Sequence, residues 1–290
     1  MIISCLYGGL GNQLFQYAAG RSLAAKHQTS LHLDVSMFGK EPLRRYVLDH
    51  FLIRATILSD AERMSLGLPS GQDGRLRRVV QRLAGLSAAP MIEERDYGFS
   101  PDVLDAPSFC CLRGYFQSPR YFEMIEEQIR LELVVSDALV GRNREIATQV
   151  GATTAVAVHV RRGDYATNAH TNKYHGTCGP DYYVSAEKLL REKLVEPHLF
   201  VFSDDPDWAE ENLHFVSPAT FLRHNDPKHD YEDLRLMSLC RHHIIANSTF
   251  SWWGAWLCVH PDKIVVAPRN WFGEAGLSTS DLIPRSWIQI

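Results

Sequence analysis

The stretch VAVHVRRGDY places charged side chains at the end of an apolar run. Alternation predicts a strand over residues 156–160, which puts His159 and Arg161 on one face. A buried charge is costly unless it meets a partner, so Arg161 and Asp164 at this strand end predict an anionic ligand. A guanidinium at the carboxyl end of a strand in a doubly wound sheet suits a diphosphate. The alternative is an ion pair between Asp164 and Arg161 or Arg162 that only fastens the loop.

Hydroxyl groups follow a second apolar run, in HHIIANSTFSWWGAW. Residues 242–246 predict a strand, and the residues from Ser251 onward predict a helix. Between them stand an amide, two hydroxyls and an aromatic ring, from Asn247, Ser248, Thr249 and Phe250. Backbone N–H groups at a helix entrance bind anions, so this segment and Arg161 together could grip two phosphates without a metal. For the helix tryptophans we favour core packing over a sugar-stacking platform.

A third polar stretch, YGGLGNQ, lies near the start of the chain between a predicted strand and a predicted helix. Asn12 and Gln13 add donors to the backbone N–H groups of this turn. The pattern resembles a dinucleotide-binding fingerprint with Asp34 downstream, but Leu14 stands where the third glycine is required. We therefore expect neither nicotinamide nor flavin, and a purely structural turn remains an alternative to a binding role.

Metal sites are not indicated by the acidic, histidine and cysteine patterns. Asp205 and Asp207 in SDDPDW could be a metal-binding pair, but Asp205 before a proline is typical of a helix N-cap, and Asp207 suits the first helical turn. The histidines form no H-E-x-x-H motif and the six cysteines no C-x-x-C pair, so we expect reduced thiols and no structural zinc.

The overall composition is that of an ordinary globular protein. The 290 residues are 45% apolar and 22% charged, with a net charge of −4, which argues against a general nucleic-acid surface. We expect a cytoplasmic protein, because the chain starts without a signal peptide and no apolar run is long enough to span a bilayer. The basic segment at 70–90 leaves peripheral contact with the inner membrane open, although a solvated surface helix is the simpler interpretation.

Strands alternate with helices along most of the chain, which predicts an α/β protein with parallel sheets. We expect two facing Rossmann-like lobes, 1–150 and 151–290, with one parallel sheet in each. Among the expected strands is a short one at 213–216.

Six motifs, in order over nearly the whole chain, resemble those of the bacterial α-1,2-fucosyltransferases: GGLGNQLFQYA, VHVRRGDY, HGTCGPDYY, FVFSDD, YEDLRLMSLCRHHIIANSTFSWWGAW and DLIPRSWI. The resemblance implies a GT-B-like enzyme that transfers fucose from GDP-β-L-fucose, with inversion, to the 2-hydroxyl of a terminal β-galactoside. It implies no obligatory metal and no other cofactor. The lobe 1–150 would face the acceptor glycan and the lobe 151–290 would bind GDP-fucose.

The same resemblance assigns roles residue by residue. His159 would contact guanosine, Arg161 the β-phosphate, and Asp233 the guanine or ribose. Asn12 matches the amide of the glycine turn, and the pyrophosphate would be lined by the segment Ser248, Thr249 and Phe250. Asp164 is expected to act as a base or to orient Arg161. We expect the acceptor to be read by the first lobe, with Asp34, Tyr115, Phe116 and Gln117 as possible lining.

Several alternatives stay open at this point. The enzyme could form another fucose linkage, such as α-1,6, or use another GDP-sugar. A non-catalytic protein that binds a nucleotide sugar or a glycan is the rival from a different class. The sequence leaves open the acceptor glycan, including a lipid-linked one, and the oligomeric state.

Overall fold

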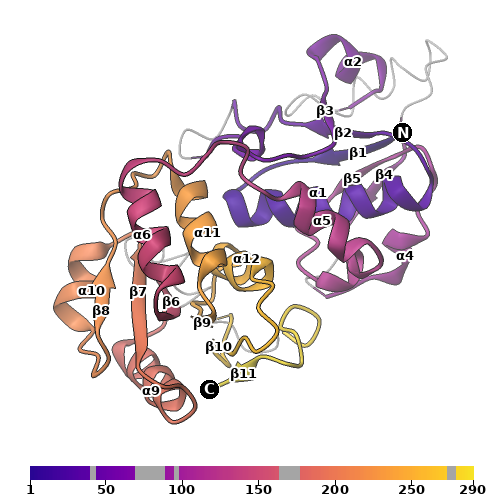
Figure 1. Ribbon diagram of the computed structural model, residues 1–290. Coiled ribbons are helices and arrows are strands. Elements are labelled where there is room, and N and C mark those ends of the chain that lie inside the picture. Colours follow the sequence, from indigo (N-terminus) through magenta and orange to yellow (C-terminus); the bar gives the residue numbers. More distant parts are fainter. Residues whose placement is uncertain (40–43, 69–88, 95–97, 163–176, 273–278) are drawn as a thin grey trace. The chain divides into compact units, whose positions relative to one another are not determined.

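The computed structural model describes residues 1–39, 44–68, 89–94, 98–162, 177–272 and 279–290. The chain forms two compact units, Met1–Val134 and Val135–Ile290 (Figure 1). The boundary expected from the sequence lies after residue 150. The compact units divide earlier because the helix Gly141–Gly151 (α6) packs against elements of the second unit.

The first unit is built on a parallel five-stranded sheet with the strand order β3-β2-β1-β5-β4. Its strands are β1 (Ile2–Cys5), β2 (Leu31–Asp34), β3 (Thr56–Ile57), β4 (Met91–Glu93) and β5 (Cys110–Arg113). Its helices are α1 (Leu10–Lys26), α2 (Asp60–Ser65), α4 (Pro101–Leu104) and α5 (Glu126–Glu132), with short 3-10 turns at η1 (Leu48–His50), η3 (Pro119–Tyr121) and η4 (Glu123–Ile125).

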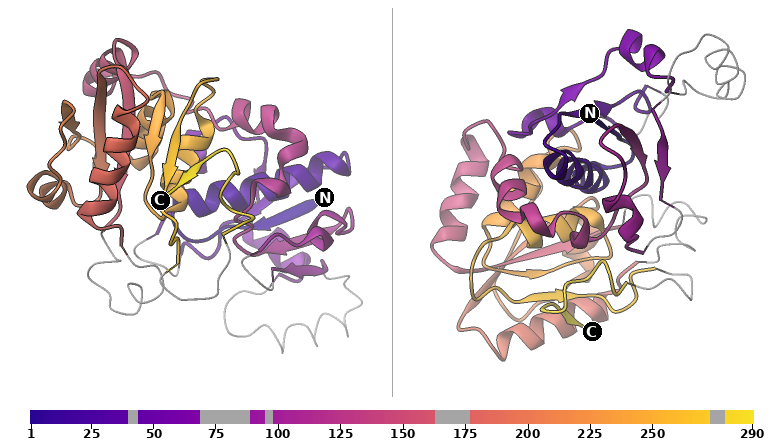
Figure 2. Two further views of the ribbon diagram at one scale, coloured as in Figure 1. Left: turned by 90° about the horizontal axis from the view of Figure 1, so that it is seen from below. Right: turned by 90° about the vertical axis from the view of Figure 1, so that its right-hand side faces the viewer.

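Helix α1 packs closely on this sheet at Gly20. A Cβ atom at Gly20 would lie 2.9 Å from Leu31 Cδ1 and 3.1 Å from Ser4 Cβ. Leu14, which occupies the third glycine position of the fingerprint, is fully buried instead. The close contact between helix and sheet is therefore at Gly20, well after the glycine turn. In the dinucleotide fingerprint this contact is made at the third glycine, so the fold differs from that fingerprint. The right-hand view of Figure 2 looks along α1 and shows the strands of its sheet beside it.

The second unit contains a parallel six-stranded sheet with the order β11-β10-β9-β6-β7-β8. Its strands are β6 (Thr154–Val160), β7 (Pro197–Ser203), β8 (Ala219–Phe221), β9 (His242–Ile244), β10 (Val265–Ala267) and β11 (Ile288–Gln289). The helices described with α6 are α9 (Pro180–Arg191), α10 (Pro206–Asn212), α11 (Asp230–Leu239) and α12 (Thr249–Leu257). Two parallel sheets confirm the predicted α/β class.

Helix α12 lies in the core of the second unit. Trp252 and Trp253 are fully buried and Trp256 is 5% exposed, so these rings pack in the core as predicted. A Cβ atom at Gly254 would lie 3.0 Å from Met237 Cβ, so glycine lets α12 approach α11 closely.

Lys263 caps the carboxyl end of α12, and this cap leads to a prediction for the free energy of unfolding. Its Nζ donates to the carbonyl oxygens of Ala255 at 2.8 Å and Cys258 at 2.7 Å. Lys263→Met leaves these helix-end carbonyls without the ammonium group, so we expect the free energy of unfolding to fall by about 2 kcal/mol. Urea denaturation measures the change. The matched control Lys193→Met, at an exposed position, is expected to stay within about 0.5 kcal/mol of wild type; equal loss in both variants would contradict the capping role.

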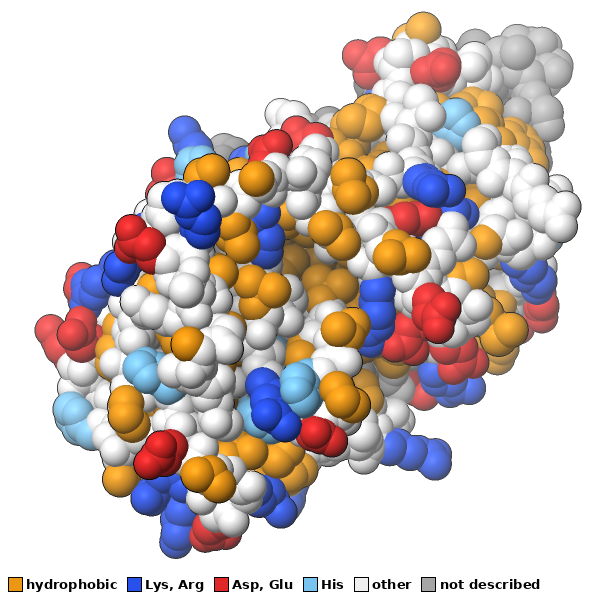
Figure 3. Space-filling model, viewed as in Figure 1, with side chains coloured by type: hydrophobic (Ala, Val, Ile, Leu, Met, Phe, Trp, Pro, Cys, Tyr) orange, Lys and Arg blue, Asp and Glu red, His pale blue; other side chains and the backbone are white. Residues whose placement is uncertain are grey.

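One prediction about local structure is wrong, and another concerns residues outside the described ranges. The expected strand at 213–216 is wrong, because Leu213 ends α10 and the strand follows at β8, where it pairs with β7. The basic segment at 70–90 lies almost entirely outside the described residues. No described helix has the length and apolar character needed to cross a bilayer. On the described part of the face in Figure 3, acidic and basic side chains are interspersed.

Candidate active site

The carboxyl edge of the second sheet brings two of the predicted stretches together. Strand β6 lies between β7 and β9, and all three run parallel, so the residues that follow them meet at one edge. The ring of His159, near the end of β6, lies 5.2 Å from the ring of Phe250, in the first turn of α12. The strand end and the helix entrance are therefore neighbours in the second unit.

Arg161 is held by a carboxylate that the sequence analysis missed. Its Nη1 lies 2.7 Å from Oδ2 of Asp204, which follows β7, and both side chains are about one quarter exposed (23% and 25%). The other oxygen of Asp204 accepts the backbone N–H of Arg162 at 2.8 Å. Asp164 lies outside the described residues, so its predicted role stays a prediction. The adjacency of β6 and β7 was the information needed to find Asp204, and spacing alone does not give it.

Arg162 is fastened to α10. Its guanidinium carbon lies 3.8 Å from the centre of the Trp208 ring, and its Nε lies 3.6 Å from Asp205 Oδ2. Asp205 caps α10, since its side chain accepts the Trp208 backbone N–H, and Asp207 pairs with Arg223. The capping interpretation of this acidic pair is confirmed. In the described part of the chain, no three His, Cys, Asp or Glu side chains cluster as metal ligands would.

His159 is a neutral imidazole. The side chain is 5% exposed, and burial together with the Arg161 charge lowers its pKa to about 3. Its Nδ1 atom has no hydrogen-bond partner among the described residues. A neutral ring with one unsatisfied nitrogen can hydrogen-bond to a ligand without adding charge.

The helix entrance after β9 combines a buried amide with hydroxyl groups. Asn247 is 2% exposed and donates to the carbonyl of Trp271 at 3.2 Å, while Cys178 lies 3.6 Å from its Oδ1. This amide therefore ties the entrance to neighbouring segments. Ser248 occupies the N-cap position of α12 without a side-chain capping bond, and Thr249 opens the helix. The first turn thus presents its backbone N–H groups at the same edge as Arg161.

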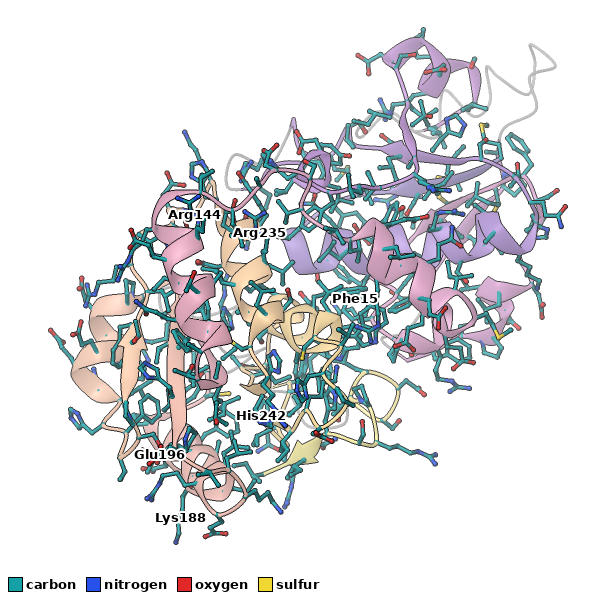
Figure 4. The ribbon with its side chains drawn as sticks, in the orientation of Figure 1. Phe15, Arg144, Lys188, Glu196, Arg235 and His242 are labelled. Carbon is teal, nitrogen blue, oxygen red and sulfur yellow. The ribbon has the colours of Figure 1, made fainter. Side chains whose placement is uncertain are left out.

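Asp233 lies in the first turn of α11 within a polar cluster. It accepts a 2.6 Å hydrogen bond from Asn225 Nδ2, and burial with the nearby charges of Asp230 and Glu232 raises its pKa to about 7. Asn225 exchanges hydrogen bonds with Asn143 of α6 at 3.0 and 3.1 Å. Figure 4 labels Arg144 on α6 and Arg235 on α11 at this end of the second unit. Asp233 was expected from the sequence, but its partner Asn225 was not, and neither was Asn143, which holds Asn225 from α6.

The cluster adjoins an open cavity through His224, which hydrogen-bonds to Asn143 at 2.7 Å. The volume of this cavity is about 260 Å³, and its lining comprises Arg142, Ile146, Thr220, Phe221, Leu222, Arg223 and His224.

In the first unit, the glycine turn and the segment after β5 meet. Gly8 has a φ of +78°, and a Cβ atom there would lie 2.9 Å from Asn12 Nδ2, so the turn requires glycine. Gln117 donates from its Nε2 to Asn12 Oδ1 at 3.1 Å. Of the expected acceptor-lining residues, Phe116 is fully buried, and Asp34 forms a buried ion pair with Arg63 at 2.7 Å.

The two units, each built on a parallel sheet, have a GT-B-like fold. A solved structure, that of a mutant of Arabidopsis thaliana FUT1 in complex with GDP, matches with a TM-score of 0.55 and 11% identity over 93% of this chain and 71% of that chain. A likeness at this identity shows the fold alone.

Residues 92–290 match the model of Glycosyl transferase family 11, and the chain belongs to this family. It is 36% identical to the O-antigen biosynthesis glycosyltransferase WbnK of Escherichia coli, over 99% of both chains. It is 32% identical to an alpha-1,2-colitosyltransferase of Escherichia coli, over 100% of this chain and 99% of the other. The expected membership in an α-1,2-fucosyltransferase family is thereby confirmed at the level of the family.

Proposed function

We propose that the protein transfers L-fucose from GDP-β-L-fucose to the 2-hydroxyl of a terminal β-galactoside, with inversion and without an obligatory metal. The observation that carries the proposal is at the carboxyl edge of the second sheet, where the ring of His159, two residues before Arg161, lies 5.2 Å from the ring of Phe250 in the first turn of α12. A fixed cation and helix N–H groups at one edge suit a diphosphate leaving group. Membership in the family supports sugar transfer, and the quoted motifs support fucose.

The chemistry follows from where charge develops. As the bond between fucose and phosphate breaks, negative charge grows on the departing GDP. Arg161 and the N–H groups at the start of α12 stabilise that charge more in the transition state than in the ground state, which accelerates the reaction. Because the fucosyl carbon becomes cationic before the acceptor hydroxyl loses its proton, a strong base is unnecessary, and Asp164 serves as a weak base or orients Arg161.

The nucleoside contacts follow the family resemblance. The neutral His159 ring contacts guanosine, and Asp233 contacts the guanine or ribose from the polar cluster on α11. Ser248, Thr249 and Phe250 line the pyrophosphate, while Asn247 holds that segment in place. Asn12, which matches the amide of the family's glycine turn, is proposed as a further donor-binding residue.

The acceptor is proposed to be a glycan of the O-antigen type, since a full-length relative is an O-antigen biosynthesis glycosyltransferase. We infer a cytoplasmic enzyme, and a lipid-linked acceptor would bring it into peripheral contact with the inner membrane. The second candidate donor is a nucleotide-linked colitose, and the specific observation in its favour is the full-length similarity to an alpha-1,2-colitosyltransferase.

Product analysis separates these donors. Purified protein is incubated with lactose and either GDP-fucose or GDP-colitose, GDP release is measured, and the linkage of the product is determined. We expect GDP release from GDP-fucose to accelerate with lactose and the product to be α-1,2-linked. Preferential use of GDP-colitose would favour the second candidate, and GDP binding without acceptor-dependent turnover would favour a non-catalytic protein.

A further inference from the structure

The turn that follows β5 has a strained backbone. Phe116 has a φ of +51°, a left-handed conformation that a bulky side chain adopts only at a cost of roughly 1–3 kcal/mol. The Phe116 ring is fully buried and meets the Tyr121 ring edge-on at 5.5 Å. The turn is thereby anchored in the core, while its neighbours Tyr115 and Gln117 remain half-buried.

Glu94, which follows β4, holds this turn through hydrogen bonds. Its carboxylate accepts the backbone N–H of Tyr115 at 2.7 Å and that of Phe116 at 3.0 Å. Gly114 permits the approach, because a Cβ atom there would lie 2.4 Å from Glu94 Cβ. A carboxylate that holds two successive N–H groups stabilises the unusual conformation of Phe116 and sets the direction of the residues on either side.

The turn presents an aromatic pair and an amide. Because Ser4 pairs with Leu112 in the register of β1 and β5, Tyr7 and Tyr115 follow their adjacent strands at the same level. Their ring centroids are 5.1 Å apart at an interplanar angle of 61°. Gln117, two residues further on, is held by its hydrogen bond to Asn12.

The chemistry of these side chains suits a neutral, hydroxylated ligand. A pyranose ring has an apolar C–H face that packs on an aromatic ring and hydroxyl groups that pair with amides and phenols. Burial, with Tyr115 and the Glu94 charge nearby, raises the pKa of Tyr7, so its hydroxyl keeps its proton and can donate. A phosphate would require a cation, and these three side chains supply none.

We infer that Tyr7, Tyr115 and Gln117 form the surface that binds the acceptor saccharide, and that Glu94 is its positioning residue. The inference rests on the proposed function. Gln117 donates a hydrogen bond to Asn12, which matches the amide of the family's glycine turn, so this surface adjoins a motif of the family.

Steady-state kinetics with GDP-fucose and lactose test the surface. Tyr115→Ala and Gln117→Ala are expected to raise the lactose KM about tenfold, the loss of one such contact. The KM for GDP-fucose and the rate of acceptor-free hydrolysis of GDP-fucose are expected to remain within about twofold of wild type. Tyr115→Phe keeps the ring and is expected to stay near wild type. The matched amide control is Gln128→Ala on α5, whose partner is Glu132.

Glu94→Gln tests positioning. In this variant an NH2 group replaces one of the two carboxylate oxygens that accept the backbone N–H groups, so the turn is held less firmly. We expect the lactose KM to rise and the rate of acceptor-free hydrolysis of GDP-fucose to stay unchanged. A merely structural role would instead lower both activities together. If Tyr115→Ala fails to fold, Gln117→Ala and Glu94→Gln carry the test.

The two proposals fail differently. Wild-type protein that transfers no sugar to lactose or related β-galactosides would overturn the proposed function. Wild-type protein that transfers fucose, with lactose KM unchanged in Tyr115→Ala and Gln117→Ala, would overturn the acceptor surface alone. So would variants in which the KM for GDP-fucose rises as much as that for lactose.

Discussion

Arg161→Ala is expected to lower kcat for fucose transfer by roughly 10²–10³, the effect of removing one preorganised donor from a developing negative charge. The guanidinium is already aligned, since Asp204 holds it at 2.7 Å and Asp204 itself is fastened to the backbone of Arg162. No reorganisation is then required when charge moves onto the nucleotide. Initial rates of GDP release at saturating lactose measure the change.

The fold is expected to survive this substitution. The lost ion pair is partly exposed and screened by solvent, so its loss lowers the free energy of unfolding by about 1 kcal/mol or less. Arg161→Lys keeps the charge but loses the fork of donors and is expected to fall between wild type and Arg161→Ala. Arg144→Ala, at an exposed position on α6, is the matched control and should retain wild-type turnover. Wild-type turnover in folded Arg161→Ala would show that the cation assignment is wrong.

Stability is expected to fall in acid because two buried histidines of the second unit stay neutral in the folded state. Burial lowers the pKa of His159 and of His243 to about 3, and nearby positive charge acts in the same direction. Between pH 6.5 and 3 the unfolded chain binds protons that the folded chain does not, so unfolding becomes more favourable as the pH falls. Each histidine contributes a loss of about 2 kcal/mol between pH 7 and pH 5, roughly 4 kcal/mol together.

Asp233 has the opposite effect on the pH dependence of stability. Its pKa is raised to about 7, so the folded state binds its proton more readily and gains stability as the pH falls through 7 towards the ordinary value. The contribution of His243 is therefore isolated by comparing two proteins. Urea denaturation of wild type and His243→Gln at pH 7, 6 and 5 gives the free energy of unfolding of each. The slope of the variant should be shallower by about 1.4 kcal/mol per pH unit below pH 6.5. Parallel slopes would mean that His243 is already protonated when folded.

The sequence predicted the elements whose pattern is long and periodic. Strand β6 and helix α12 follow directly from their apolar runs, and Gly8 and Gly9 gave the turn before α1. The helix begins at Leu10, so Asn12 and Gln13 lie in its first turn and not in the predicted turn. The two-residue strands β3 and β11 were not predictable, because an alternating pattern needs more residues than they contain. The strand expected at 213–216 failed because Leu213 caps the end of α10 and the sheet is joined only from Ala219 onward, in β8.

The residues of the site could be predicted from the sequence only where they lie together in one segment of the chain. Arg161 and the Asn247–Phe250 segment each end an apolar run, so sequence found both, and parallel strands bring them to one edge. Asp204, Asn225 and Glu94 depend on which strands are neighbours and on contacts between distant segments. Asp34 was expected to line the acceptor site, but its carboxylate forms a buried ion pair with the guanidinium of Arg63.

The central claim is that Arg161 holds the diphosphate of the departing nucleotide, and titration calorimetry with GDP and with guanosine tests it most directly. Both ligands carry the base and ribose, and only GDP carries the phosphates. The account predicts that Arg161→Ala binds GDP at least about tenfold more weakly than wild type while guanosine affinity is unchanged. Unaltered GDP affinity in the variant, or an equal loss for guanosine, would contradict it.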